Sequence, residues 1–205
     1  MPIVTMIADP NGSGKSTLTR ELERLGIPLG IYLNADDIAA TMSGDPHMVA
    51  AGAQQVVRER RAEAIKGGLD HSFETVMSHP SHIDHLVTAR AAGFDTRLYF
   101  VATEDPFINI GRVANRVKHG GHYVPFEKIS DRYYRCLANL PAAIAVADEG
   151  LIYDNSEIDE PMRVVARIIE GIIDNLPSKN LPLWWRRYMD AYKAKLASDF
   201  GLNLK

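Results

Sequence analysis

The sequence has little cysteine, no long apolar run and no excess of charge of one sign. Cys136 is the single cysteine among 205 residues, so no disulfide can form within the chain, and we expect a reducing, cytoplasmic setting. No stretch approaches the roughly 18 apolar residues of a membrane span, and the first residues lack the basic start of a secretory signal. The formal net charge is −3, whereas proteins that coat nucleic acid are usually basic. We therefore expect no membrane span and consider a nucleic-acid partner unfavoured.

Short apolar runs rich in β-branched residues alternate with amphipathic stretches along the chain. We expect strands at residues 3–8, 31–33, 69–76, 96–103 and 151–153. We expect helices at residues 17–25, 48–66, 82–92, 106–117, 126–147 and 161–176, with a break near Pro141. This alternation predicts an α/β fold with three layers (αβα), a mostly parallel sheet and helices on both of its faces. A possible boundary at residues 177–182 separates a main domain, residues 1–176, from a helical C-terminal extension, residues 177–205.

A glycine-rich segment follows the first predicted strand. Residues 8–17 read ADPNGSGKST, and the end of this segment fits the phosphate-binding pattern G-x-x-x-x-G-K-[ST]. The glycines let successive backbone N–H groups point into one concavity, and the following helix adds its positive end. Lys15 is placed to reach the β- and γ-phosphates and Ser16 to ligate Mg²⁺. The predicted ATP-binding residues are Asn11, Gly12, Ser13, Gly14, Lys15, Ser16 and Thr17. The alternative is an ordinary glycine-rich turn with a capping serine.

One position departs from the phosphate-binding pattern. Asp9 stands where the first glycine is expected. A carboxylate about 6 Å from a phosphate charge, at an effective dielectric constant near 20, costs on the order of 2–3 kcal/mol. That cost corresponds to about one to two decades in affinity. Aspartate tolerates unusual backbone angles, so we expect the fold to survive and nucleotide binding to be weaker than with glycine.

Carboxylates follow the second and third predicted strands. Asp36 and Asp37 lie in YLNADDIA, and Glu74 and Thr75 lie in HSFETVMS. In a doubly wound fold these positions face the ligand crevice at the carboxyl edge of the sheet. In the first segment a phosphotransferase needs a carboxylate to accept the proton of the attacking hydroxyl. In the second, Glu74 could hold Mg²⁺ through water or bind a substrate hydroxyl, with help from Thr75. The alternatives are a helix N-cap in the first segment and a plain loop carboxylate in the second.

Residues 111–135 form a basic segment with a Gly-Gly pair in its middle. It carries six cations against two anions, which predicts a helical lid that closes over phosphates. The lid residues assigned to phosphate or substrate contacts are Arg112, Arg116, His122 and Arg132. The alternative is a solvated pair of charged helices. The loop after the last predicted strand contains Asn155 and Ser156, one of which we place near the adenine base, with a simple turn as the alternative.

The C-terminal tail alternates aromatic and basic residues. Trp184, Trp185 and Tyr188 recur at helical spacing beside Arg186 and Arg187. This pattern favours a terminal helix that packs its aromatic side chains on the domain. Stacking on single-stranded nucleic acid and docking to a partner or a membrane surface stay open as alternatives.

Taken together, these motifs resemble those of the zeta-toxin-like family of P-loop kinases. The matching stretches are ADPNGSGKST, YLNADDIA, SFET, the lid segment and YDNS, and they cover residues 3–156. The resemblance implies an ATP- and Mg²⁺-dependent kinase acting on a small-molecule hydroxyl, such as that of a UDP-activated amino sugar. It also implies an antitoxin-like protein partner. Asp36 then takes the place of the catalytic base, Glu74 that of a substrate-side carboxylate, and Arg112 and Arg116 contact phosphates.

Two other hypotheses remain beside the small-molecule kinase. The first is a nucleotide-binding or partner-binding protein whose nucleotide site is weakened by Asp9. The second is a nucleotide or polynucleotide kinase, which salt-sensitive nucleic-acid binding would reveal. The charge distribution fits phosphate recognition at defined places: residues 111–135 and residues 179–205 each carry a net charge of +4, and the rest of the chain carries −11.

Overall fold

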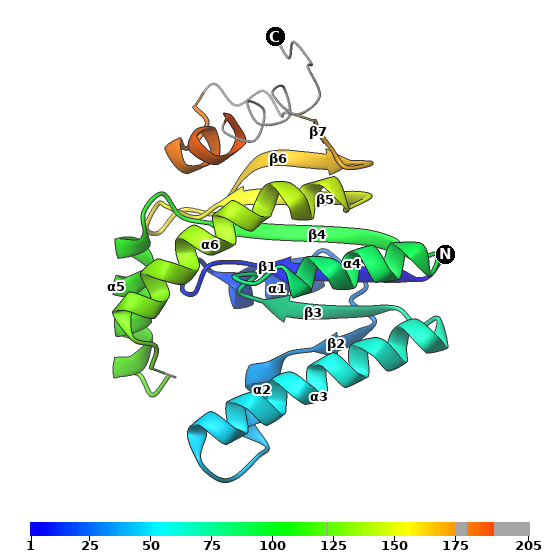
Figure 1. Ribbon diagram of the computed structural model, residues 1–205. Helices are drawn as coiled ribbons and strands as arrows, with labels where there is room; N and C mark the ends of the chain where they lie inside the picture. Colours follow the sequence, from blue (N-terminus) through cyan, green and yellow to red (C-terminus); the bar gives the residue numbers. More distant parts are fainter. Residues whose placement is uncertain (122, 175–179, 191–205) are drawn as a thin grey trace.

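The computed structural model describes residues 1–121, 123–174 and 180–190. Its centre is a sheet with the strand order β2-β3-β1-β4-β5-β6-β7 (Figure 1). The strands are β1 (Ile3–Ala8), β2 (Ile31–Leu33), β3 (His71–Thr75), β4 (Asp95–Ala102), β5 (Glu149–Asp154), β6 (Arg163–Ile169) and β7 (Ile172–Asp174). The helices are α1 (Lys15–Arg24), α2 (Ala35–Ala40), α3 (Pro46–Gly67), α4 (Ser81–Ala91), α5 (Pro106–Lys118) and α6 (Phe126–Ala145). The first five strands in the sheet order pair in parallel, which confirms the predicted α/β fold.

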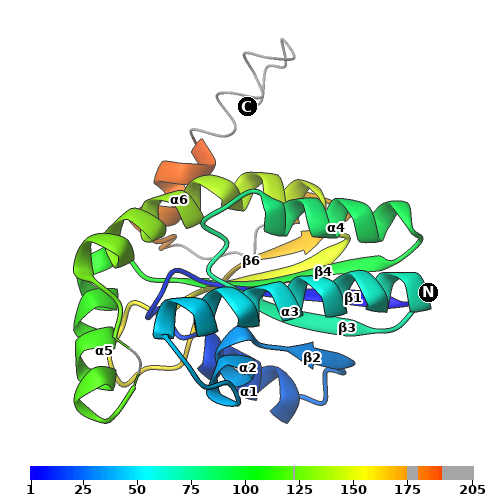
Figure 2. The same cartoon turned by 60° about the horizontal axis from the view of Figure 1, so that its bottom comes forward.

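The alternation of side chains along β1 creates the two faces of the sheet. Val4, Met6 and Ala8 point to one face, where they join a large buried cluster with α3, α4 and α6. Ile7 points to the other face and packs with Leu18 and Leu22 of α1. Because successive side chains of a strand point to opposite faces, the apolar run of β1 contributes buried side chains to both faces of the sheet. The result is the expected three-layer arrangement (Figures 1 and 2).

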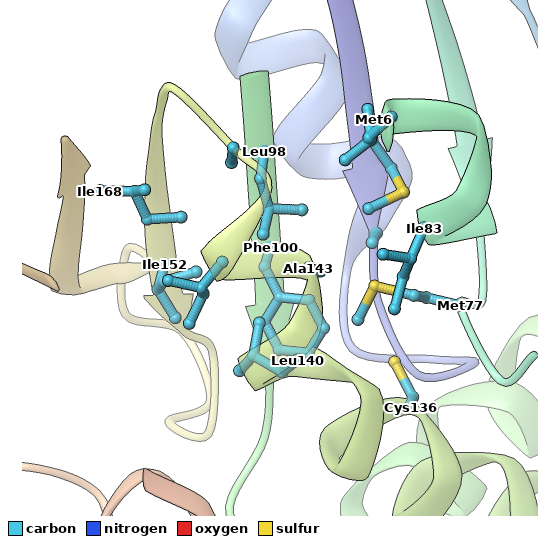
Figure 3. Close-up of a cluster of buried hydrophobic side chains, with 14 of the residues drawn as sticks. Met6, Met77, Ile83, Leu98, Phe100, Cys136, Leu140, Ala143, Ile152 and Ile168 are labelled. Carbon is cyan, nitrogen blue, oxygen red and sulfur yellow. The ribbon is translucent and has the colours of Figure 1, made fainter. Parts of the chain in front are cut away.

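The larger core cluster lies between the sheet and α6. Phe100 of β4, Leu140 of α6 and Ile152 of β5 are each fully buried there (Figure 3). Cys136 lies in the same cluster, and burial raises the pKa of its thiol well above the ordinary value. Each buried side chain of this size stabilises the fold by about 1.5–3 kcal/mol relative to exposure.

The sheet topology places the glycine-rich loop at a crevice. β1 lies between β3 and β4: the connection from β1 leads to β2 on one side, and the connection from β3 crosses to β4 on the other side. Ligands of open α/β sheets bind outside the carboxyl ends of the strands at such a switch point. The loop of residues 9–14 leaves β1 at this edge, and α5 lies across the same end of the sheet (Figures 1 and 2).

The helix predicted at residues 161–176 is wrong, because this segment forms the β6–β7 hairpin. β6 pairs antiparallel with both β5 and β7, and Ile169 pairs with Ile172 across a two-residue turn. The turn residues Glu170 and Gly171 have φ values of 51° and 73°. A tight turn with two positive φ values matches the twist of a hairpin. The isoleucine and valine spacing fits a helix face, but β-branched residues pair well in strands.

The predicted break near Pro141 is also wrong, since α6 continues through this residue. A proline inside a helix costs about 3 kcal/mol because it removes one hydrogen bond and crowds the preceding turn. Leu137, Leu140 and Ile144 on either side of it are almost completely buried. Their burial offsets the cost and keeps the helix in place against the sheet.

The C-terminal segment packs as the tail pattern predicts, as far as residue 190. Residues 183–190 are helical, and Trp184, Trp185 and Met189 are buried in the main core cluster. Residues 191–205 lie outside the described residues. Within the described part of the chain, we find no helix that combines the length and the apolar character needed to cross a membrane.

Buried histidines on the α4 face predict a loss of stability in acid. His71 Nδ1 donates to the Leu69 carbonyl oxygen at 3.0 Å, so its Nε2 accepts from His85 Nε2 at 3.0 Å. Burial, with the charge of Arg61 second, lowers the pKa of His82 to about 4 and that of His85 to about 3. Burial also lowers the pKa of His71.

These histidines stay neutral in the folded protein while they bind protons in the unfolded chain below about pH 6.5. We therefore expect the stability that these neutral histidines contribute to be fully present above that pH. Below it the free energy of unfolding should fall by up to about 1.4 kcal/mol per pH unit for each neutral histidine, until the pH reaches the lowered pKa values of about 4 for His82 and about 3 for His85. Urea unfolding at several pH values measures this slope. His85→Gln should reduce the slope, and His47→Gln, at an exposed site, should not; a flat profile in the wild type contradicts the expectation.

Candidate active site

The glycine-rich loop has the backbone geometry that a phosphate-binding loop needs. Gly12 and Gly14 have φ values of 88° and 119°. A Cβ on Gly12 would lie 2.7 Å from the Asn109 carbonyl oxygen, and one on Gly14 would lie 2.6 Å from Asn155 Nδ2. Gly14, the N-cap of α1, has no side chain, and the backbone N–H of Lys15 donates to Asp9 Oδ2 at 3.0 Å. Ser16 and Thr17 in the first turn are exposed, so this part of the turn is accessible to an anion.

Two amide side chains brace this loop from outside. Asn109 of α5 is fully buried and donates through Nδ2 to the Asn11 carbonyl oxygen at 2.8 Å and to Ser13 Oγ at 2.9 Å. Asn155 donates through Nδ2 to the Ser13 carbonyl oxygen at 2.7 Å. The structure thus gives Asn155 a contact with the loop backbone, and its assignment to the adenine base stays a prediction. Asn109 was not predicted from the sequence, although an amide among the apolar residues of FINIGRV was a signal.

Asp9 lies beneath the loop, paired with the phosphate-binding lysine. Its Oδ1 accepts from Lys15 Nζ at 2.8 Å and its Oδ2 from the Lys15 backbone N–H at 3.0 Å. The Asp9 side chain is 2% exposed, and its φ is not in the left-handed region. The position therefore does not require glycine. Burial raises the pKa of Asp9 above its ordinary value, although the Lys15 ammonium acts against this rise.

Glu74 stands on the other side of the same lysine. Its Oε1 accepts from Thr19 Oγ1 at 2.7 Å and from the Tyr32 hydroxyl at 2.6 Å. Its Oε2 accepts from Asn34 Nδ2 at 3.3 Å and lies 3.8 Å from Lys15 Nζ. Burial, followed by the contact with Glu74, raises the pKa of Tyr32. Glu74 thus joins α1, β2 and the loop before α2 into one polar arrangement at the carboxyl edge.

The surrounding carboxylates keep Lys15 charged. Burial acts to lower the pKa of Lys15, but the nearby carboxylates outweigh it and raise the pKa. They belong to Asp9, Glu74 and, more weakly, Asp36. The ammonium is therefore a permanent cation at the mouth of the loop, 17% exposed. This position suits a contact with phosphate oxygens.

Asp36 and Asp37 lie in the first turn of α2 and are both exposed. Asn34 serves as the N-cap, since its Oδ1 accepts from the Asp36 backbone N–H at 2.9 Å. The cap of α2 is thereby provided by Asn34 and not by the side chain of either aspartate. Asp36 is the one whose charge acts on Lys15. Asp37 faces a neighbouring cavity of about 330 Å³, which is lined by Tyr32, Asn34, Asp37, Ile38, Thr41 and Arg60.

The lid residues occupy different surroundings. Arg112 Nη1 donates to the Asn155 carbonyl oxygen at 2.8 Å, and burial lowers its pKa. Arg132 Nη1 lies 3.5 Å from Asn11 Oδ1, so α6 brings this cation to the loop. Arg116 is exposed near the C-terminal end of α5. His122 lies outside the described residues.

Thr75, another residue predicted to contact the substrate, has structural partners. Thr75 is buried, and its Oγ1 accepts from the Met77 backbone N–H at 2.9 Å. Its carbonyl oxygen accepts from the Asp9 backbone N–H at 3.2 Å, which joins β3 to the start of the loop. Thr75 therefore shapes the crevice floor, and its assignment to substrate contact stays a prediction.

The side-chain oxygen atoms around the loop are chemically suitable ligands for Mg²⁺. The exposed Ser16 hydroxyl, together with the carboxylates of Asp36 and Glu74 near Lys15, supplies hard oxygen atoms of the kind that Mg²⁺ prefers. Within the described residues no group of three or more histidine, cysteine, aspartate or glutamate side chains is placed to hold a metal alone. This arrangement suits an ion carried mainly by phosphates and water.

The fold and the loop geometry together define a P-loop kinase-like protein. The sequence pattern of the family described as zeta toxin matches residues 1–160. The chain therefore belongs to the zeta-toxin family, whose members are phosphotransferases of the P-loop class.

The chain is also similar to individual proteins. An uncharacterized protein of Haemophilus influenzae is 31% identical over 124 residues, which cover 60% of this chain and 86% of the relative. The fold is similar to a chain of the AvrRxo1-ORF1:-ORF2 crystal structure with ATP (TM-score 0.68, 13% identity, 95% of this chain and 63% of that chain). It is also similar to a chain from the PezAT chromosomal toxin–antitoxin system of Streptococcus pneumoniae (TM-score 0.58, 12% identity, 97% and 87%). The chain spans less than two thirds of the matched AvrRxo1 chain.

Proposed function

We propose that the protein transfers the γ-phosphoryl group of ATP to a hydroxyl group of a small molecule. The observation that carries this proposal is the clustering of three charged side chains at one edge of the sheet. Lys15 lies at the open N-terminus of α1, Glu74 lies 3.8 Å from its ammonium, and the Asp36 carboxylate acts on the same ammonium. A cation for the phosphate and a carboxylate for the acceptor are thus next to each other.

In the proposed reaction the acceptor oxygen attacks the γ-phosphorus while the bond to the ADP oxygen breaks. Asp36 accepts the proton that the acceptor hydroxyl loses. Lys15 and the P-loop backbone stabilise the negative charge on the transferring group, and Arg132 approaches from α6. Mg²⁺, held by Ser16 and the nucleotide phosphates, would supply further charge neutralisation.

The cavity next to Asp37 suits the acceptor. Its volume of about 330 Å³ lies at the small end of the range for ligand pockets. Tyr32 and Asn34 in its lining are both hydrogen-bonded to Glu74, so the cavity lies beside the carboxylate that is 3.8 Å from Lys15 Nζ. Arg60 adds an exposed cation at the rim, where a phosphate of the acceptor can bind. These features support a UDP-activated amino sugar as the first acceptor to test.

An assay of ATP consumption with UDP-N-acetylglucosamine tests this function. We expect ADP formation to increase when the acceptor is added and Mg²⁺ is present, and to stop when Mg²⁺ is chelated. A panel of other UDP-sugars and nucleosides identifies the acceptor if this sugar is inactive. ADP formation that no acceptor stimulates, across the whole panel, would contradict the proposal.

The structural relatives also support a protein partner. One of them comes from a toxin–antitoxin system and another from a two-component AvrRxo1 complex. We infer that an antitoxin-like protein binds this chain, and that the chain works in the cytosol, where ATP is available. Co-purification of the untagged chain with the product of a neighbouring gene is the expected result.

The Asp9–Lys15 ion pair favours a second candidate, a nucleotide-binding protein with weakened catalysis. At 2.8 Å the carboxylate competes directly with phosphate for the ammonium. Asp9→Gly should then lower the Kd for ATP by about ten- to a hundredfold, the range expected for a charge at this distance. Isothermal titration calorimetry measures the change, and the isosteric Asp9→Asn should fall on the same side of the wild type. Unchanged or weaker ATP binding in both variants would show that Asp9 does not weaken the nucleotide site.

A further inference from the structure

The C-terminal segment of residues 180–190 is joined to the end of β5 by a buried polar arrangement. Glu104, in the loop after β4, accepts from the backbone N–H groups of Leu183 and Trp184 at 3.0 Å each. This carboxylate caps the helical turns at residues 183–190, because it satisfies two of their free donors. The Trp184 ring, 3% exposed, packs 6.2 Å from the Phe100 ring.

The indole N–H of Trp184 makes the most buried of these contacts. It donates to Asp154 Oδ1 at 2.9 Å, and Asp154 is 6% exposed. Ser156 Oγ donates to the same oxygen at 2.6 Å and accepts from the Glu104 backbone N–H at 2.8 Å. We call Glu104, Asp154, Ser156 and Trp184 the Asp154 network. Its members close a ring of hydrogen bonds that joins three parts of the chain.

Asn155 lies between two members of the Asp154 network and is the residue that braces the P-loop. Its backbone N–H donates to the Ala102 carbonyl oxygen at 2.8 Å, and its side-chain amide donates to the Ser13 carbonyl oxygen at 2.7 Å. Its own carbonyl oxygen accepts from Arg112 of the lid at 2.8 Å. Asn155 therefore connects the Asp154 network to the P-loop and to Arg112 of the lid.

We propose that Trp184 is a positioning residue for the nucleotide site, so that the segment of residues 180–190 forms part of that site. The indole N–H holds Asp154 Oδ1, while Arg163 lies 3.4 Å from Asp154 Oδ2. In this proposal the position of Asp154 sets the turn that carries Asn155, and Asn155 in turn holds the Ser13 carbonyl oxygen of the P-loop. This inference rests on the proposed function, because it concerns the affinity for ATP.

Trp184→Phe tests the proposal because it keeps an aromatic ring in the core and removes the indole N–H. The matched control is Trp185→Phe, since Trp185 is as buried, at 4% exposed, and lies in the same helical turn. We expect the Kd for Mg·ATP, measured by calorimetry, to rise about five- to tenfold in Trp184→Phe, as for the loss of one buried hydrogen bond. In Trp185→Phe it should stay within about twofold, although both variants lower the melting temperature.

A second pair of variants keeps the test decisive if Trp184→Phe folds poorly. Asp154→Asn retains an acceptor oxygen for the indole and Asp154→Ala removes it, so ATP binding should be weakened in the alanine variant and largely restored in the asparagine variant. Equal ATP affinity in Trp184→Phe and wild type, or equal losses in both tryptophan variants, would overturn the proposal. A wild-type protein that binds no ATP would instead refute the proposed function itself.

Discussion

Asp36→Asn is expected to lower kcat for phosphoryl transfer by about a hundred- to ten-thousandfold, the contribution typical of a general base. The substitution keeps the size and the exposure of the side chain, and Asn34 continues to cap α2. The Kd for ATP should therefore change by less than about threefold. Steady-state kinetics with the active acceptor, together with ATP titration, separates the two effects.

Asp37→Asn is the matched control, because Asp37 is the adjacent exposed carboxylate on the same turn of α2. Its side chain lines the acceptor cavity, so we expect a higher KM for the acceptor and a kcat within about tenfold of the wild type. A kcat that falls in Asp37→Asn and not in Asp36→Asn would transfer the role of base to Asp37. Full turnover in both variants would show that neither carboxylate acts as the base.

Lys15→Met is expected to abolish ATP binding and to destabilise the fold. Removal of the ammonium leaves the Asp9 carboxylate buried with no cation, and breaking a buried ion pair in this way costs about 3–5 kcal/mol. The double variant Asp9→Asn/Lys15→Met should recover most of that stability, because no charge then remains buried at position 9. It should not recover ATP binding. Urea unfolding and nucleotide titration measure the two properties separately.

Lys66→Met, at an exposed position near the end of α3, is the control for the loss of a lysine. Its stability should stay within about 0.5 kcal/mol of the wild type. If Lys15→Met is as stable as the wild type, or if the second substitution restores no stability, the ion pair contributes less than its burial implies. Retained ATP affinity in Lys15→Met would contradict the role given to this lysine.

The phosphate-binding loop could be predicted from the sequence because its chemistry depends on residues that are adjacent in the chain. Glycines at fixed offsets followed by Lys15 and Ser16 define the loop without any knowledge of the fold. The parallel sheet was also predictable, since β-branched runs alternate with helical patterns. The functional roles assigned to Asp36, Glu74 and the lid arginines stay predictions.

What the sequence could not show depends on contacts between distant segments. From the sequence, Asp9 was expected to be an anion beside the phosphates, but the fold buries its side chain against Lys15. The P-loop brace by Asn109 comes from α5, almost a hundred residues later, and has no local pattern. The β6–β7 hairpin was missed because its isoleucine spacing fits both a helix face and paired strands. Only the turn at Glu170 and Gly171 distinguishes them.

Phosphorus NMR of a mixture of the protein, Mg·ATP and UDP-N-acetylglucosamine tests the central claim most directly. The account predicts a new phosphomonoester resonance that grows as the γ-phosphate resonance of ATP declines, and that is absent with Asp36→Asn. Two results would contradict the proposed kinase reaction. One is that the wild type releases inorganic phosphate at the full rate of ATP loss with every acceptor supplied. The other is that Asp36→Asn forms the same phosphomonoester at the wild-type rate.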